Sequence, residues 1–262
     1  MNWNNDTNEA NKAGIYAHSI LAKFYKFRPP YLDVFFNELS LKLGIKSEDR
    51  ILDLCCGKGE LAKGFSKLAG EIYAVDGSPE MLSDSFKDEK IIYHLCNVNS
   101  GTLPFDEKFN YILIGTAIHW IRDYALTPIV NHNLLTNGRI CIIHRSLDFD
   151  EQDFNESLRW LNSKYGKKID YKPDFSGADK MKKCGLIEVD RLSIEKTVSF
   201  DLKYLYLNQL SLAYGAFQNN VIMKPDAYKN EFIETISPYV NDGRLSGRLT
   251  NNAIIYQVLG VS

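Results

Sequence analysis

The stretch Ile51-Leu-Asp-Leu-Cys-Cys-Gly-Lys-Gly-Glu60 decides how this chain folds. Its apolar start predicts a buried strand, its glycines predict a tight turn, and Glu60 begins a helical pattern. An acid, Asp53, stands inside the strand, four residues before the first glycine. A strand, a glycine turn and the start of a helix together form the element with which α/β folds bind nucleotide-like ligands.

Two cofactors suit this element, and the presence of Asp53 in the strand favours one of them over the other. Gly57-x-Gly59-x-x-Ala62, with the acid Asp76 about 20 residues on, satisfies the dinucleotide pattern, in which amides at the helix start hold phosphates. S-adenosylmethionine (SAM) has no phosphate, but it carries an ammonium, a carboxylate and a cationic sulfonium. We expect Asp53 to hold the turn's amides and to lie near the ammonium, directly or through water. SAM is therefore the first hypothesis, and NAD is the alternative.

Short apolar strands alternate with helices along the middle of the chain, which predicts a parallel, doubly wound α/β sheet. We expect helices over 59–68, from Ser78-Pro79 onward and over 123–135, with a turn at Asn137-Gly138. The expected strands are 51–55, 71–75, 91–96, 111–115 and 139–144.

The flanking segments predict a single compact domain with helical additions. Helical spacing from about Ala10 to Phe27, and again over 32–43, predicts an N-terminal helical cap over residues 1–45. The SAM-binding core is expected over 46–146. Residues 147–262 are expected to complete the sheet and to supply helical insertions that cover the substrate. The segment 202–217 is apolar around most of its circumference, so it is expected to pack over the ligand end of the sheet or against another subunit.

The expected elements after the core are helices over 151–165, 177–184, 202–217 and from Pro225 to about Ile236, and strands over 186–199 and 253–258.

Composition excludes several classes of protein. The formal net charge of −2 over 262 residues gives no basic surface for nucleic acid. The polar start Met1–Asp6 is not a secretory signal, and no run approaches the ~18 apolar residues of a membrane span. Five cysteines without metal-ligand spacing favour a reducing cytoplasm and no metal site. We expect a cytoplasmic monomer or homodimer.

Polar side chains follow the expected strands at the edge where parallel sheets bind ligands. Asp76 can accept hydrogen bonds from both ribose hydroxyls, although an acid in Asp-Gly-Ser-Pro can also be an ordinary turn residue. Asn97 can meet an adenine amino group while the Val98 amide meets a ring nitrogen, or Asn97 can simply belong to a turn. The expected cofactor-binding residues are Asp53, Cys55, Gly57, Gly59, Asp76, Gly77, Ser78, Met81, Asn97, Val98 and Thr116.

The hydrophobic-Asp-hydrophobic-x-x-Gly-x-Gly run, the acid Asp76 and Leu103-Pro104-Phe105 resemble class I SAM-dependent methyltransferases. Tyr25-x-x-Arg28-Pro29-Pro30-Tyr31 and Ala117-Ile118-His119-Trp120 are similar to the trans-aconitate methyltransferase-like branch. The resemblance implies a mostly parallel seven-stranded sheet, SAM as methyl donor with S-adenosylhomocysteine as product, no metal, and a small-molecule acceptor.

Three residues depart from the family pattern. Cys55 stands where the family often has glycine, Asn97 where it often has aspartate, and Tyr111 where a strand acid is common.

Methyl transfer needs an aligned acceptor and exclusion of water more than it needs a nucleophilic side chain. His119 is the candidate catalytic base for a hydroxyl acceptor, or it packs with Trp120 and moves no proton. A carboxylate acceptor needs no base but does need a cationic clamp. Arg28 is one candidate clamp, or it caps the preceding helix. Arg145 is the other, or it forms a surface salt bridge.

The expected substrate-binding residues are Tyr25, Arg28, Trp120, Arg145 and Tyr214, with Tyr204 a further aromatic candidate.

The sequence therefore predicts a SAM-dependent methyltransferase acting on a small molecule, with a carboxylate or hydroxyl oxygen as the acceptor atom. An N-methyltransferase, or a sugar- or peptide-directed methyltransferase, keeps the same fold. An NAD-dependent oxidoreductase and an inactive SAM-binding scaffold remain the alternatives of other classes.

Overall fold

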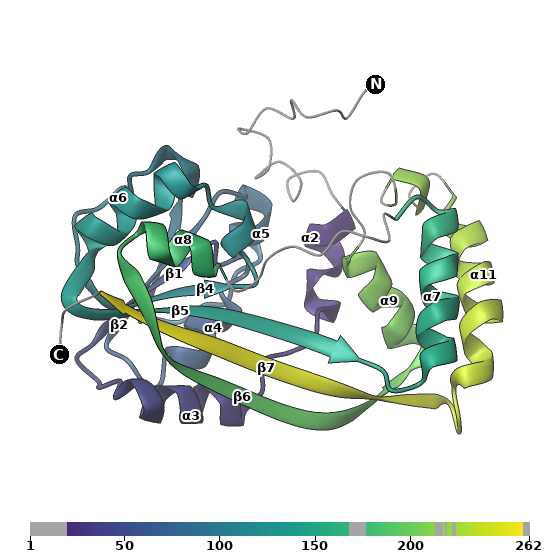
Figure 1. The fold of residues 1–262 in the computed structure, drawn as a ribbon. Coiled ribbons are helices and arrows are strands. Elements are labelled where there is room, and N and C mark those ends of the chain that lie inside the picture. The colour runs from purple at the N-terminus through teal and green to yellow at the C-terminus, as the bar shows by residue number, and fades with distance from the viewer. Residues whose placement is uncertain (1–19, 168–176, 213–216, 218, 222–223, 259–262) are drawn as a thin grey trace.

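A computed structural model describes residues 20–167, 177–212, 217, 219–221 and 224–258. Within these residues the chain forms one seven-stranded sheet in the order β3-β2-β1-β4-β5-β7-β6 (Figure 1). Neighbours among the first five strands in this order are parallel, and β7 runs antiparallel to both β5 and β6. The mostly parallel, seven-stranded α/β sheet is therefore confirmed. The strands are β1 (Arg50–Leu54), β2 (Glu71–Asp76), β3 (Ile91–Leu95), β4 (Phe109–Gly115), β5 (Leu134–Asp148), β6 (Leu186–Asp201) and β7 (Arg244–Val258).

Helices cover both faces of the sheet, so its central strands are buried on both sides. The helices α3 (Asp33–Leu43) and α4 (Glu60–Phe65) pack on one face, where Ile51 joins Phe35 and Phe65. On the other face α6 (Asp123–Asn133) and α8 (Ala178–Lys183) enclose Leu52 and Ile112. Two-sided burial explains why these strands are continuous apolar runs rather than alternating ones.

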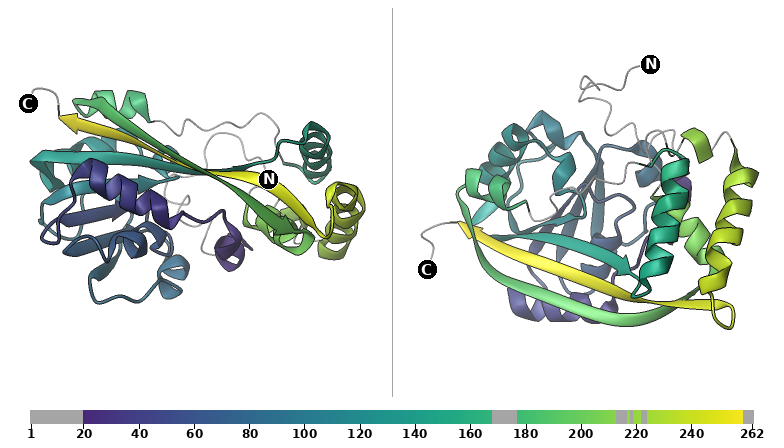
Figure 2. Two further views of the ribbon diagram at one scale, coloured as in Figure 1. Left: turned by 90° about the horizontal axis from the view of Figure 1, so that it is seen from below. Right: turned by 45° about the vertical axis from the view of Figure 1, so that its right-hand side comes forward.

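The strands β5, β6 and β7 are 15, 16 and 15 residues long, and they extend well beyond the short β1 (Figure 2). Their extension carries α7 (Gln152–Lys164), α9 (Leu202–Ser211) and α11 (Pro225–Ile236), which we call the cap helices. The cap helices share a separate core around Phe154, Tyr228 and Phe232. The helix α2 (Ile20–Phe24) and the 3-10 turn η2 (Tyr25–Phe27) pack on α9 and so lie between the sheet and the cap helices.

The turn predicted at Asn137-Gly138 is wrong, because β5 begins already at Leu134 and the pair lies inside that strand. The pairing with β4 shifts there from Phe109–Leu134 to Tyr111–Arg139, so the ladder is irregular at this dipeptide. None of the helices within the described residues is long and apolar enough to cross a membrane.

The described part of the expected helix 202–217 is α9, and it packs against α2, α11 and the end of β6. Its buried face is polar as well as apolar, because Asn208, Gln209 and Ser211 are buried beside Leu205 and Leu210. Hydrogen bonds between helices explain this polar content. The Asn208 side-chain amide donates to the Phe27 carbonyl at 2.9 Å.

Candidate functional site

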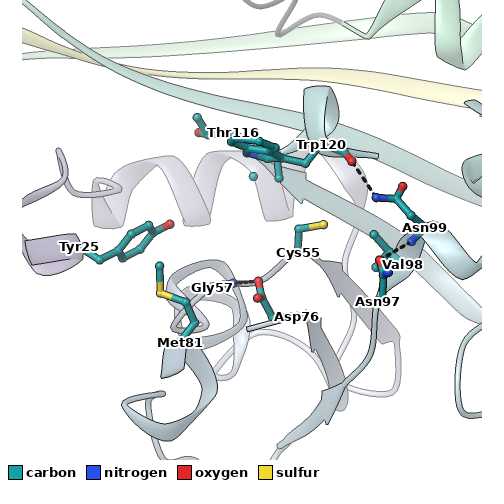
Figure 3. Close-up of a pocket in the computed structure, with 13 residues that line it drawn as sticks. Tyr25, Cys55, Gly57, Asp76, Met81, Asn97, Val98, Asn99, Thr116 and Trp120 are labelled. Carbon is teal, nitrogen blue, oxygen red and sulfur yellow. Dashed lines mark hydrogen bonds between the residues drawn. The ribbon is translucent and has the colours of Figure 1, made fainter. Parts of the chain in front are cut away.

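A narrow crevice of about 80 Å³ opens at the carboxyl ends of β1, β2, β3 and β4 (Figure 3). We call it the strand-end crevice. Its walls come from the loops that follow four parallel strands, the place where open α/β sheets bind ligands. The lining residues are Tyr25, Cys55, Gly57, Asp76, Gly77, Met81, Asn97, Val98, Asn99, Gly115, Thr116, Ala117 and Trp120. The structure thus brings together eight of the eleven expected cofactor-binding residues.

The glycine turn after β1 has the backbone form that the sequence predicts. Gly57 and Gly59 have φ values of 58° and 81°, which favour glycine. A Cβ on Gly59 would lie 2.2 Å from the Tyr93 hydroxyl, so this position has no room for a side chain. Gly59 does not line the strand-end crevice and acts through packing. Over Gly57 lies the Tyr25 hydroxyl, 3.3 Å from the place of a Cβ, so Tyr25 covers the turn.

Asp76 is the central polar group of the strand-end crevice. Its Oδ2 accepts a hydrogen bond from the Gly57 amide at 2.8 Å (Figure 3). Its Oδ1 accepts one from the Ser78 amide, also at 2.8 Å. Burial raises the pKa of this carboxyl, while the amide hydrogen bonds act in the opposite direction. A carboxylate has about four acceptor positions, so Asp76 keeps acceptor capacity for a ligand's hydroxyl. The ribose contact stays a prediction.

Ser78 and Met81 have different roles in the loop after β2. Ser78 is 1% exposed and caps α5 (Pro79–Ser83), because its Oγ accepts the Met81 amide at 3.2 Å. This confirms the expected helix cap. Ser78 does not line the strand-end crevice, so its expected direct contact with the cofactor is not supported. Met81 does line it, beside Gly77.

Asp53 does not line the strand-end crevice. Its side chain is 1% exposed and lies beneath α4, where Oδ2 accepts the Ala62 amide at 3.1 Å. Burial raises the pKa of Asp53 to about 8, and the charges of Asp76 and Glu60 act in the same direction. The expected position beside an ammonium group is therefore not seen. Asp53 instead supports the helix that follows the glycine turn.

Cys55 and Thr116 end β1 and β4 in left-handed conformations, with φ of 56° and 53°. Both line the strand-end crevice. A left-handed φ is the physical reason why a glycine suits position 55. Burial raises the pKa of the Cys55 thiol well above its ordinary value, so the sulfur is a neutral wall rather than a nucleophile.

The loop after β3 adds a residue that sequence reasoning missed. Asn97 Oδ1 accepts the Asn99 amide at 3.0 Å, so part of its acceptor capacity serves a turn. Asn99 then bridges to the loop after β4: its amide group donates to the Trp120 carbonyl at 3.1 Å, and its Oδ1 accepts the Arg122 amide at 2.8 Å. This bridge holds two walls of the strand-end crevice together (Figure 3). The only signal for Asn99 in the sequence was its place near a strand end.

Only some of the aromatic candidates line the strand-end crevice. Tyr25 and Trp120 line it from opposite sides (Figure 3). His119 does not line it and packs on the indole of Trp120, with 4.7 Å between ring centroids. This geometry favours the packing role for His119. Tyr214 lies outside the described residues.

Neither arginine candidate lines the strand-end crevice. The Arg145 side chain is 5% exposed and pairs with Glu60 at 2.5 Å, so the salt bridge expected as the alternative forms, but Arg145 is buried and not at the surface. Its guanidinium stacks on the Tyr31 ring at 4.5 Å, and the Tyr25 ring lies at 5.8 Å. Sequence reasoning missed Glu60 as the partner because a helix-start acid is usually a dipole or capping residue.

Arg28 joins the N-terminal segment to the cap helices. Its Nε donates to the Ser211 carbonyl at 3.0 Å, and its guanidinium lies 5.7 Å from the Tyr25 ring centroid. The backbone of Arg28 ends η2, as the capping alternative predicted. Arg28 therefore stands between the strand-end crevice and α9.

Comparisons with known proteins show similarity to methyltransferases over the strands that form the strand-end crevice. Residues 51–133 match the family model of the methyltransferase domain. The demethylmenaquinone methyltransferase of Staphylococcus saprophyticus is 30% identical over 112 residues, which are 40% of this chain and 48% of that protein. The chain thus spans about half the length of this relative. These matches make the segment 51–133 similar to methyltransferase domains, and the trans-aconitate methyltransferase-like branch stays a prediction.

Solved structures show the same fold over most of the chain. A protein of Anaeromyxobacter dehalogenans, assigned as a type II methyltransferase, superposes with a TM-score of 0.63 at 13% identity and covers 88% of this chain and 97% of its own. The 4+2 cyclase SpnF superposes with a TM-score of 0.54 at 13% identity, covering 96% and 97%. At these identities the likeness shows the fold alone.

Proposed function

We propose that this protein is a cytoplasmic SAM-dependent methyltransferase that methylates an oxygen of a small molecule. The observation that carries the proposal is Asp76 at the end of β2, with its carboxylate oriented by the amides of Gly57 and Ser78 and exposed to the strand-end crevice. A match to a methyltransferase domain over the same strands supports it.

The residues of the strand-end crevice fit the parts of SAM. Asp76 offers acceptors to the ribose diol, while Met81 and Val98 offer apolar walls to the adenine. Tyr25 and Trp120 offer ring faces to a cation. Because Tyr25 covers Gly57 and the crevice holds about 80 Å³, less than the ~300 Å³ of typical ligand pockets, the Tyr25 side chain turns aside on binding.

Bound SAM supplies a methyl group on a positively charged sulfur. The chain's own contribution is to exclude water with Tyr25 and Trp120 and to fix the direction of approach. The ionisable lining residues are Tyr25, Cys55 and Asp76, and burial raises the pKa of the last two. Asp76 is already assigned to the ribose hydroxyls, and the neutral Cys55 thiol is a poor base for an alcohol. A carboxylate oxygen needs no base and is the proposed acceptor, and its cationic clamp must come from outside the strand-end crevice, because neither Arg28 nor Arg145 lines it.

Binding of S-adenosylhomocysteine (SAH), SAM and NAD by the full-length protein tests the proposal. SAH at 100 times its Kd should stabilise the fold by about 2.7 kcal/mol, whereas NAD should not stabilise it. Asp76→Asn keeps the polar shape and one acceptor oxygen, and it should bind SAH more weakly than the wild type. Asp76→Ala should bind most weakly. Stabilisation by NAD alone, or full SAH affinity in Asp76→Ala, would overturn the cofactor assignment.

Turnover is tested separately, by SAH release from SAM with a panel of small carboxylates, alcohols and amines. Release with a carboxylate supports the acceptor atom, and release with an amine alone contradicts it. Because the cyclase SpnF shares the fold, SAH binding without SAH release would favour an inactive or non-methylating protein. The oxidoreductase alternative is disfavoured by β7, which runs antiparallel between β5 and β6 where dinucleotide folds place parallel strands.

A further inference from the structure

A second cavity of about 700 Å³ lies between the end of β5, the helix α7 and the end of α9. This volume is typical of small-molecule sites. The helix α7 lines it along most of its length, because one of its faces points inward at helical spacing. The lining residues are Asp148, Phe149, Asp150, Gln152, Asn155, Leu158, Arg159, Asn162, Lys167, Gln209 and Leu212. We call this space the cap cavity.

The wall of the cap cavity contains fixed polar groups where the cap helices would otherwise form an apolar core. The Asn162 amide donates to Gln209 Oε1 at 2.9 Å, and the Tyr228 hydroxyl donates to Asn162 Oδ1 at 2.8 Å. Asn162 and Gln209 are 4% and 7% exposed. Buried amides carry a desolvation cost, so a network that orders them at a cavity wall is suited to a polar ligand.

Lys167 lies just beyond the C-terminal end of α7, and its ammonium has no carboxylate partner among the described residues. Its Nζ lies 5.6 Å from the centroid of the buried Phe217 ring. Desolvation and the charge of Arg28 lower the pKa of Lys167 to about 8. The acids of the cap cavity, by contrast, have partners. Asp148 accepts the Ser146 hydroxyl at 2.8 Å, and Asp150 pairs with Arg248 at 3.4 Å.

Arg28 connects the cap cavity to the strand-end crevice. Its guanidinium faces the Tyr25 ring, which lines the crevice. Its Nε holds the Ser211 carbonyl, next to Leu212 of the cap cavity. Arg28 is also the charged group that acts on Lys167. Arg28 therefore contacts Tyr25 of the strand-end crevice and Ser211, the chain neighbour of Leu212 in the cap cavity.

We propose that the cap cavity binds the methyl acceptor and that Lys167, assisted by Arg28, holds an anionic group of that acceptor remote from the methylated atom. This inference rests on the proposed function for the identity of the bound molecule. The anionic group is a carboxylate or a phosphate, and the polar wall formed by Asn162 and Gln209 accommodates further polar groups of the same molecule.

The charged groups around Lys167 define the pH dependence of anion binding. Arg28 faces it from η2, Arg159 lies on the same wall of α7, and Asp148 and Asp150 lie on the part of the wall formed by the end of β5. Lys167 loses its charge as the pH rises through about 8. Anion affinity should therefore be full below that pH and should fall by up to tenfold per pH unit above it.

Calorimetric titration of the full-length protein with inorganic phosphate, glutarate and neutral glutaramide tests the inference. One or both anions should bind to the wild type, which also distinguishes phosphate from carboxylate, and glutaramide should bind more weakly. Lys167→Met should lose tenfold or more of the anion affinity, because a charge-assisted hydrogen bond is removed. Lys167→Arg should retain binding and remove its fall near pH 8.

The matched control is Lys164→Met, because Lys164 is the last residue of α7, is exposed and pairs with Glu231. It should bind anions like the wild type. SAH affinity should be unchanged in all three variants. If the wild type does not bind SAH at all, the proposed function is contradicted, but the comparison of anion affinities between the variants still tests the anion site. Equal anion affinity in the wild type and Lys167→Met, or equal binding of glutaramide and glutarate, would overturn the inference.

Discussion

Cys55 and Thr116 hold the same left-handed backbone conformation, with φ of 56° and 53°, at the carboxyl ends of the neighbouring parallel strands β1 and β4. Side chains in this conformation cost roughly 1–2 kcal/mol each. The two residues face one crevice, so the strain is concentrated where a ligand would bind. Such strain is typical of binding sites, where the surrounding fold forces a residue into place.

The substitution Cys55→Gly should raise the free energy of unfolding by up to about 1 kcal/mol, because it removes the strained Cβ. Urea denaturation measures the change. The control Cys55→Ala removes the thiol and keeps the Cβ, so it should show no gain. A stabilisation of the same size in both variants would mean that the thiol, and not the backbone, carries the strain.

Asp53 should make the protein less stable as the pH rises. Its pKa is about 8 in the folded state against an ordinary value of 3.8, so the folded state binds this proton more tightly. The contribution to stability is full below about pH 4 and is lost by about pH 8, with a slope of at most about 1.4 kcal/mol per pH unit. Urea denaturation across this range should show a steeper fall for the wild type than for Asp53→Asn. Parallel pH profiles would contradict the prediction.

Removal of Glu60 should be costly because it leaves Arg145 charged and buried. Glu60→Gln should lower the free energy of unfolding by about 2–4 kcal/mol, toward the range seen when one partner of a buried pair is lost. The double variant Glu60→Gln with Arg145→Met should recover part of this loss. A double-mutant cycle measures the coupling. A coupling below about 1 kcal/mol, as in exposed pairs, would show that the pair is solvated in solution.

His119 should act through the position of Trp120 and not as a base. The substitution His119→Phe keeps a ring against the indole and should retain the rate of SAH release, with the accepted member of the panel, to within about an order of magnitude. His119→Ala should lower it through looser packing of the crevice wall. Loss of about 10²–10⁴ in both variants, together with loss of the pH dependence, would establish general-base catalysis.

The sequence predicted the parallel core well because its information is local. The run from Ile51 to Glu60 contains a strand, a turn and a helix start, and each is specified by adjacent residues. The helix start at Ser78-Pro79 followed from local capping preferences. The clustering of Asp76, Met81 and Val98 followed from the rule that strand ends meet at one edge. The Asn137-Gly138 pair was misleading, since the same dipeptide suits a turn and an irregularity within a strand.

The sequence did not predict which side chains from distant segments would pair in the folded structure. The Glu60–Arg145 pair joins residues from α4 and β5, and the Arg28–Ser211 hydrogen bond joins segments 183 residues apart. Neither pairing leaves a periodic pattern. Asp53 shows the limit most clearly, because its place in the strand was correct while its side chain lies under α4 and not toward the ligand edge. Which way a single buried acid points depends on the packing of the helix above it.

The ladder between β6 and β7 runs without a register shift from Asp190–Ile255 to Asp201–Arg244, and this has a mechanical consequence. The same two strands belong to the core sheet and also support the cap helices, so they connect the two parts rigidly and without a hinge. Swinging the cap helices away as a unit would require breaking interstrand hydrogen bonds. Entry of small molecules to the strand-end crevice therefore depends on movement of the short N-terminal segment Tyr25–Arg28, which lies between the sheet and the cap helices.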